Sequence, residues 1–174
     1  MAYTDKTRHV LSVLVQDVDG IISRVSGMFT RRGFNLVSLV SAKTSTPGIN
    51  RITIVVDADE VRIEQISKQL NKIVQVIKVV RLEEEATVAR ALLLVKVDVN
   101  NHTRPQVVDA ATIFRARVVD VAPESVVIEA TGTPGKLQAL LDVLEPFGIR
   151  EMLQSGQIAL NRGPRTLSPV PSRT

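Results

Sequence analysis

The chain has 174 residues, of which 44% are hydrophobic, enough for one ordinary domain or two small ones. It contains no cysteine, which excludes disulfides, thiolate catalysis and zinc sites built on cysteine. Most of the net charge of +4 comes from Arg162, Arg165 and Arg173 near the end of the chain. A nearly neutral body with one tyrosine and no tryptophan argues against nucleic-acid binding.

The sequence also bears on the compartment. It has no run of about 18 apolar residues that could cross a bilayer. Met1 to Arg8 lacks the apolar core of a signal peptide. We therefore expect a cytoplasmic protein that binds no membrane.

The first predicted unit begins with a buried strand, Val10 to Val15, made largely of β-branched residues. An amphipathic helix follows, because apolar residues recur at intervals of three and four, at Ile21, Ile22, Val25, Met28 and Phe29. Asp19 is expected to cap this helix, and Gly33 to end it in a left-handed conformation. A second strand is expected from Leu36 to Val40.

The turn between the first strand and the helix contains Asp17, Asp19 and Gly20. Amides at the start of a helix can hold an anionic group such as a carboxylate. From this motif alone, the favoured interpretation is that these residues only form the turn and cap the helix. Gly20 adds one observation, since a residue without a Cβ lets a ligand or a second chain approach the backbone closely.

The next elements complete the first domain. Ile49 to Val56 alternates as a strand and is expected to form a hairpin with Leu36 to Thr44. Asp57 to Glu60 is expected to cap a second helix that buries Ile63, Ile66, Leu70 and Ile73 or Val74, and Gln75 to Leu82 forms the fourth strand. This order predicts an α+β fold, a ferredoxin-like βαββαβ domain over residues 1–82.

A second copy of the unit is expected after an acidic linker at residues 83–90. Residues 91–160 repeat the order strand, helix, strand, strand, helix, strand, and Met28 to Arg31 aligns with Ile113 to Ala116 at an offset of 85. The fold class is therefore two ferredoxin-like domains in tandem. The second copy lacks the Asp-Gly turn, and residues 161–174 are expected to form a disordered basic tail.

The sequence contains little that suggests catalysis. His9 and His102 are the only histidines, neither lies in a catalytic motif, and both are expected at the surface. Three functions remain: a ligand-binding regulator, an RNA-binding module and a structural adaptor. The strands at 10–15 and 49–56 carry no aromatic residue on which RNA bases could stack, so the RNA-binding module is set aside. Composition does not decide between regulator and adaptor.

The residues themselves carry a family resemblance. The segments that carry it are VLSVLVQDVDGIISRVSGMFTRRGFNLVSLVSAKT, RITIVV, IFRARVVDV and GTPGKLQALLDVLEPFGIREMLQSGQIAL. From about Val10 to Arg162 the chain resembles the small regulatory subunit of acetolactate synthase, also called acetohydroxyacid synthase. The resemblance implies an N-terminal ACT domain, which is an amino-acid sensor with a ferredoxin-like fold.

The resemblance also implies a function. Such a subunit is not catalytic; it binds and activates a large subunit that condenses two pyruvates, or pyruvate and 2-ketobutyrate, and makes it sensitive to valine. Thiamine diphosphate, magnesium and FAD belong to that large subunit, and no cofactor is expected in this chain. Two alternatives are an ACT-type sensor that regulates another enzyme and a free-standing sensor.

The resemblance further implies a homodimer formed by the ACT domains, with valine at the interface. The motif match assigns Asp17, Gly20 and Ile21 of one protomer and Asn35 and Leu36 of its partner to the valine site. Family members often carry asparagine where this chain has Asp17. The helix-start amides suit the ligand carboxylate, oxygens of Asp17 or Asn35 suit its ammonium, and Ile21 and Leu36 suit its side chain.

Overall fold

The computed structural model describes residues 7–167. It divides the chain into two compact units. Of the described residues, one unit contains 7–88 together with 157–167, and the other is Ala89–Gly156. No helix within residues 7–167 is long and apolar enough to cross a membrane.

The first unit has the predicted order of elements. They are β1 (Thr7–Gln16), α1 (Ile21–Arg31), β2 (Asn35–Lys43), β3 (Ile49–Ala58), α2 (Glu60–Asn71) and β4 (Val76–Leu82). The strands form one antiparallel sheet in the order β2-β3-β1-β4, so β1 lies in the interior of the sheet and β2 at an edge. The prediction of a ferredoxin-like α+β unit is confirmed.

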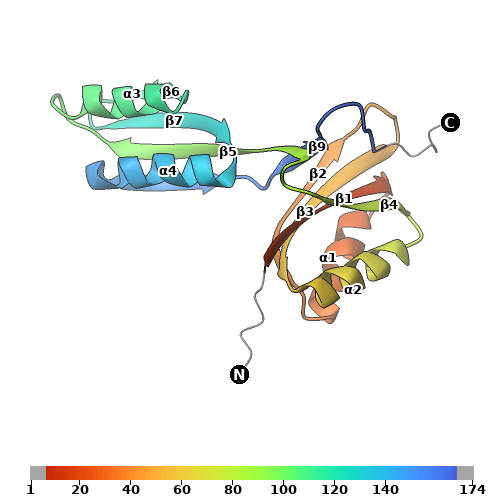
Figure 1. The fold of residues 1–174 in the computed structure, drawn as a ribbon. Helices are drawn as coiled ribbons and strands as arrows, with labels where there is room; N and C mark the ends of the chain where they lie inside the picture. Colours follow the sequence, from red (N-terminus) through yellow and green to blue (C-terminus); the bar gives the residue numbers. More distant parts are fainter. Residues whose placement is uncertain (1–6, 168–174) are drawn as a thin grey trace. The chain divides into compact units, whose positions relative to one another are not determined.

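Both helices of the first unit lie on one face of this sheet (Figure 1). The core between the layers includes Val25 and Phe29 of α1, Ile66 and Leu70 of α2, and Val13 of β1, each at most 1% exposed. Burying one such side chain contributes about 1.5–3 kcal/mol to folding. Ile22 was predicted to join them but is 38% exposed, because it lies about 100° around the helix from Ile21.

The face of the first sheet turned away from the helices is buried as well. Ser12, Leu14, Thr53 and Val55 are at most 3% exposed although they alternate with the helix-facing residues along their strands. Arg51 lies on the same face, and its Nε donates a 2.5 Å hydrogen bond to Ser12 Oγ. Burial lowers the pKa of the Arg51 guanidinium.

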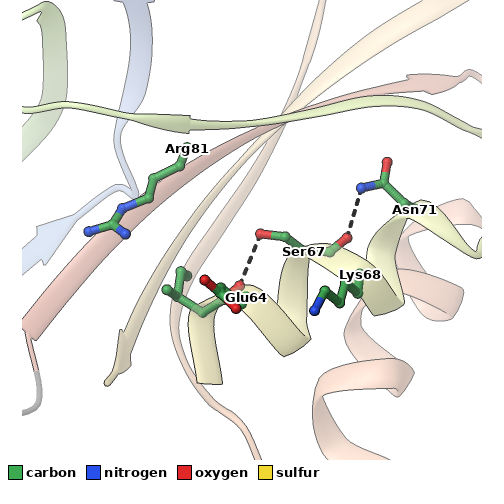
Figure 2. Close-up of a pocket in the computed structure, with 6 residues that line it drawn as sticks. Glu64, Ser67, Lys68, Asn71 and Arg81 are labelled. Carbon is green, nitrogen blue, oxygen red and sulfur yellow. Dashed lines mark hydrogen bonds between the residues drawn. The ribbon is translucent and has the colours of Figure 1, made fainter. Parts of the chain in front are cut away.

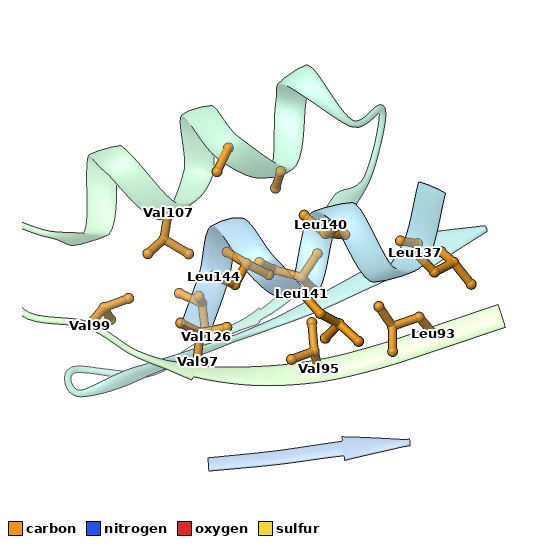
Figure 3. Packing of buried hydrophobic residues seen from close by; sticks show 14 of the residues in the cluster. Leu93, Val95, Val97, Val99, Val107, Val126, Leu137, Leu140, Leu141 and Leu144 are labelled. Atoms are coloured by element: carbon orange, nitrogen blue, oxygen red, sulfur yellow. The ribbon is translucent and has the colours of Figure 1, made fainter. Parts of the chain in front are cut away.

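The second unit repeats the arrangement. Its elements are β5 (Thr87–Asp98), α3 (Arg104–Ile113), β6 (Arg117–Val121), β7 (Ser125–Gly132), α4 (Pro134–Leu144), a 3-10 turn η1 (Glu145–Phe147) and β8 (Ile149–Gln154). The sheet order β6-β7-β5-β8 matches that of the first unit strand for strand. Strand β9 (Ile158–Asn161) belongs to the first unit and pairs with β5, whose first residues, Thr87 and Val88, also belong to that unit. Figure 3 shows Leu93, Val95 and Val97 of β5 directed at the two helices.

Three boundaries differ from the sequence prediction. Strand β5 begins at Thr87, so residues 87–90 belong to a strand and not to a linker. Helix α2 ends at Asn71, before the two residues predicted as alternatives for its last buried position; Ile73 packs partly buried against the core, whereas Val74 is 88% exposed. Strand β9 extends into the first residue of the predicted tail, and residues 168–174 of that tail lie outside the described part of the chain.

The two units align differently from the sequence prediction. Helix α1 closes at Arg32 and α3 at Phe114, which gives an offset of 82 rather than 85. The offset of 85 matched short helical segments of similar composition, whereas the helix ends fix the register. Gly33 ends α1 in the left-handed conformation with a φ of 65°, as predicted.

His9 is not a surface residue, contrary to the prediction. It is 5% exposed, and its Nε2 lies 3.0 Å from the carbonyl oxygen of Ala58. A carbonyl only accepts, so this ring nitrogen donates. Its position at the start of an interior strand explains the burial. His102 is exposed, as predicted.

Candidate functional site

The turn between β1 and α1 is anchored to the rest of the first unit through its backbone. The Asp17 amide donates to the carbonyl oxygen of Gly48 in the β2–β3 turn at 2.9 Å. Gly20 has a φ of 80°, and a Cβ added there would meet no atom within 4 Å. The glycine is therefore required by the backbone conformation, and the space beside it is open.

The start of α1 has no side-chain cap. Asp19 was predicted to cap it, but Gly20 is the N-cap residue, so Asp19 lies one position too early. The first turn of the helix contains no acid, and the amides of Ile22 and Ser23 find no acceptor within residues 7–167. Helices α2 and α4 differ, since Asp59 and Thr133 cap them. The α1 start thus offers free N–H groups and the positive end of the helix dipole.

Two aliphatic side chains border these free amides, and the sequence analysis did not assign them to the site. Val18 is 40% exposed and Ile22 is 38% exposed. Ile21, which was assigned, is only 4% exposed and packs in the core. Helical geometry could have indicated Ile22, since Ile21 and Ile22 cannot both face the sheet.

The other two assigned residues lie at the opposite end of the same sheet. Asn35 pairs with Asp57, which pairs with Arg8 near the start of β1, whereas the turn follows Gln16 at the end of β1. Gln16 lies eight positions after Arg8 along the strand, a distance of roughly 27 Å. Within one protomer the structure therefore brings Asp17, Gly20 and Ile21 together but not Asn35 and Leu36 with them.

Strand β2 is an edge strand, so one of its sides is open to a further strand. Its end at Lys43 pairs with Asn50, which in turn pairs with Val15. The end of β2 thus lies at the same end of the sheet as the β1–α1 turn, and its beginning lies at the other.

A hollow lies between α2 and β4 and has a volume of about 230 Å³ (Figure 2). Its polar groups are largely occupied: Ser67 Oγ donates to the carbonyl oxygen of Ile63, and the Asn71 amide donates to that of Ser67, both at 3.0 Å. Arg81 reaches Glu60 with two hydrogen bonds of 2.7 and 2.9 Å. These bonds lower the pKa of Glu60 and raise that of Arg81. The arrangement serves to join α2 to β4.

Within residues 7–167 no three His, Cys, Asp or Glu side chains gather closely enough to hold a metal ion. The carboxylates of Asp17 and Asp19 at the turn are both exposed. The chemistry offered at this turn is therefore that of free amides, nearby carboxylates and exposed aliphatic groups, which suits a small zwitterion better than a cation alone.

Comparisons with known proteins give the same family for both units. Residues 11–78 match the family model of the ACT domain of acetohydroxyacid synthase small subunits, and residues 90–163 match that of the acetolactate synthase small subunit. The acetolactate synthase small subunit of Mycobacterium bovis is 54% identical over 157 residues, which cover 90% of this chain and 94% of that protein. The Mycobacterium leprae subunit is 51% identical over 162 residues, covering 93% and 96%.

A solved structure agrees with the sequence relatives. The crystal structure of the acetolactate synthase small subunit from Thermotoga maritima superposes with a TM-score of 0.84 at 34% identity, and the match covers 91% of this chain and 99% of that one. The likeness extends over both units. This chain belongs to the family of small regulatory subunits of acetolactate synthase.

Proposed function

We propose that this chain activates a thiamine-diphosphate-dependent catalytic subunit of acetolactate synthase and makes it sensitive to valine. The family membership supports a large catalytic partner, and the free amides at the α1 start support the binding of an amino-acid carboxylate. Thiamine diphosphate, magnesium and FAD would be held by the partner, in the cytoplasm. This chain would contribute no group to the condensation of two pyruvates.

The valine site would be shared between two protomers. In a two-fold dimer in which the β2 edges pair antiparallel, the start of each β2 lies beside the end of the other. The partner's Asn35 and Leu36 then lie at the same end of the sheet as Asp17, Gly20 and Ile21. The separation of these two groups within one protomer is the observation that favours this arrangement.

Each group of the site would have a defined role. The free amides of α1 would bind the ligand carboxylate, and oxygens of Asp17 and the partner's Asn35 would accept from its ammonium. Ile21 is largely buried, so the exposed side chains of Ile22 and Val18, with the partner's Leu36, would surround the aliphatic side chain. Valine inhibits only if it binds one arrangement of the dimer better than another.

The test uses the chain reconstituted with its purified catalytic subunit. Gly20→Asp places a carboxylate among the free amides, where it competes with and repels the ligand; Asn35→Ala removes the contribution of the partner. Both variants should activate the catalytic subunit normally and lose valine inhibition. Gly163→Asp makes the same change at another glycine with a left-handed φ, 70°, where a Cβ also meets no atom within 4 Å, and should leave inhibition unchanged. Unaltered valine inhibition in both site variants would rule out this site.

A further inference from the structure

The sheet of the second unit carries an exposed aliphatic surface, here called the leucine face. It consists of Leu92 and Leu94 of β5, Leu153 of β8 and the half-buried Val127 of β7. Leu92, Leu94 and Leu153 are 41%, 39% and 71% exposed. They lie on one face because Leu94 pairs with Leu153 and because residues two apart on a strand point the same way.

The leucine face is the side of the sheet turned away from α3 and α4. Leu93, Val95 and Val97 alternate with these leucines along β5 and point into the core beneath the helices (Figure 3). A sheet face open to water normally carries polar residues at such positions. Three exposed leucines there indicate a surface that another structure covers.

The first unit provides the comparison, since it has the same fold. On its equivalent face Ser12, Leu14, Thr53 and Val55 are at most 3% exposed. In the second unit, β5 instead presents Leu92 and Leu94 to solvent, and Val127 of the neighbouring β7 is half-buried. The first unit thus buries this face of its sheet, whereas the second unit exposes it.

The charges around the leucine face define what it can bind. Arg117 pairs with Glu129 at 2.7 Å, and Lys96 with Glu151 at 3.8 Å, all on this side of the sheet. The charges within these two pairs neutralise one another, and Arg90, two residues before Leu92 on β5, adds one positive charge on this side. An apolar surface of low charge therefore fits the face better than a strongly charged one.

The size of the face argues against a second copy of this chain as the sole occupant. Three strands about 4.8 Å apart and six residues long cover roughly 300 Å², less than half of the area that each side of a stable complex buries. A partner that also contacts other parts of the chain can use such a face as one portion of a larger interface.

We infer that the leucine face docks on an apolar surface of the catalytic large subunit. This rests on the proposed function, because that function requires such a partner. The second unit thereby holds the catalytic subunit, while the β1–α1 turn of the first unit senses the ligand.

The test compares two double variants of the full chain. Leu94→Lys with Leu153→Lys alters the leucine face; Ile113→Lys with Val143→Lys alters two aliphatic residues of α3 and α4 that are 78% and 43% exposed. Affinity for the purified large subunit is measured by calorimetry, valine binding by titration of the small subunit alone, and mass by light scattering. The face variant should bind the large subunit about thirtyfold more weakly, because the leucines lie within the contact. The control should bind like wild type, and valine binding should persist in both.

The remaining outcomes distinguish failure of this inference from failure of the proposed function. Equal affinity of wild type and face variant for the large subunit overturns the inference, and so does a face variant whose only change is a smaller mass, which would assign the face to a second copy. If wild type itself fails to bind the large subunit, the proposed function fails and this inference with it. The single change Leu153→Lys, at the most exposed leucine, serves if the double variant does not fold.

Discussion

Gly33 and Arg115 occupy the same place in the two units. Each is the left-handed residue just after the first helix, with φ values of 65° and 54°. In both units the following amide reaches back to the helix, Phe34 to Phe29 at 3.0 Å and Ala116 to Ala111 at 2.8 Å. The backbone geometry of the helix end is thus repeated. Only the first unit has glycine at this position, and glycine adopts the left-handed conformation without strain.

Arg115→Gly should therefore stabilise the second unit. The left-handed conformation costs a residue with a Cβ about 1 kcal/mol, and glycine avoids this cost. The matched change Gly33→Ala should destabilise the first unit by roughly 1 kcal/mol, since an added Cβ meets no atom within 4 Å and only the backbone strain remains. Urea unfolding followed by circular dichroism measures both. A destabilised Arg115→Gly variant would contradict the explanation.

His9→Phe should destabilise the first unit by about 1–3 kcal/mol, because it removes the donor that faces the buried carbonyl of Ala58. His9→Gln is the control, since the Gln amide can place a donor near the position of Nε2. We expect Gln to retain more stability than Phe in thermal unfolding. Equal loss in both variants would mean that ring packing, not the hydrogen bond, accounts for the residue.

The Glu60–Arg81 pair should make stability fall in acid. The hydrogen bonds from Arg81 hold the pKa of Glu60 below its ordinary value of 4.5. A carboxyl whose pKa is lowered by folding stabilises the protein above the unfolded pKa and stops doing so as pH falls through the folded pKa. Wild type should thus unfold at a higher temperature than Glu60→Gln at pH 6, and the difference should shrink below about pH 4. A constant difference between pH 6 and pH 3 would show that ionisation of Glu60 is not involved.

Asp17→Asn should strengthen valine binding if the ligand carboxylate lies at the α1 amides. An asparagine keeps an oxygen for the ammonium but carries no charge to repel the carboxylate. The expected gain is roughly tenfold, from removing about 1.4 kcal/mol of repulsion. Calorimetry with valine measures it, with Asp142→Asn in α4 as a control for a lost surface charge. Weaker binding in Asp17→Asn would instead place the carboxylate of Asp17 on the ammonium as its main partner.

Much of the fold could be predicted from the sequence because hydrophobic periodicity determines it. The spacing of Val25, Phe29 and Ile66, Leu70 identified both helices of the first unit and their buried sides. The order of the elements then indicated the ferredoxin-like arrangement. The sequence also indicated that the second unit repeats the first, but the predicted offset between the two units was wrong by three residues.

The remaining features depend on tertiary contacts that periodicity does not report. His9 was predicted to be a surface residue because it is polar and precedes a strand. Its hydrogen bond to the carbonyl oxygen of Ala58 offsets the cost of burying its ring nitrogen. Asp19 looked like a cap, but the left-handed Gly20 moved the helix start by one residue. The leucine face could not be predicted from the sequence, because exposed and buried leucines follow one another along β5.

The claim that two protomers share one valine site is tested most directly by mixing two defective variants. Gly20→Asp and Asn35→Ala homodimers are allowed to exchange subunits, and valine binding is measured before and after. A mixed dimer contains one site with both defects and one site with neither, so random exchange should restore about a quarter of the wild-type sites. Exchange that restores no valine binding, with mixed dimers verified by mass spectrometry, would place the whole site within a single protomer.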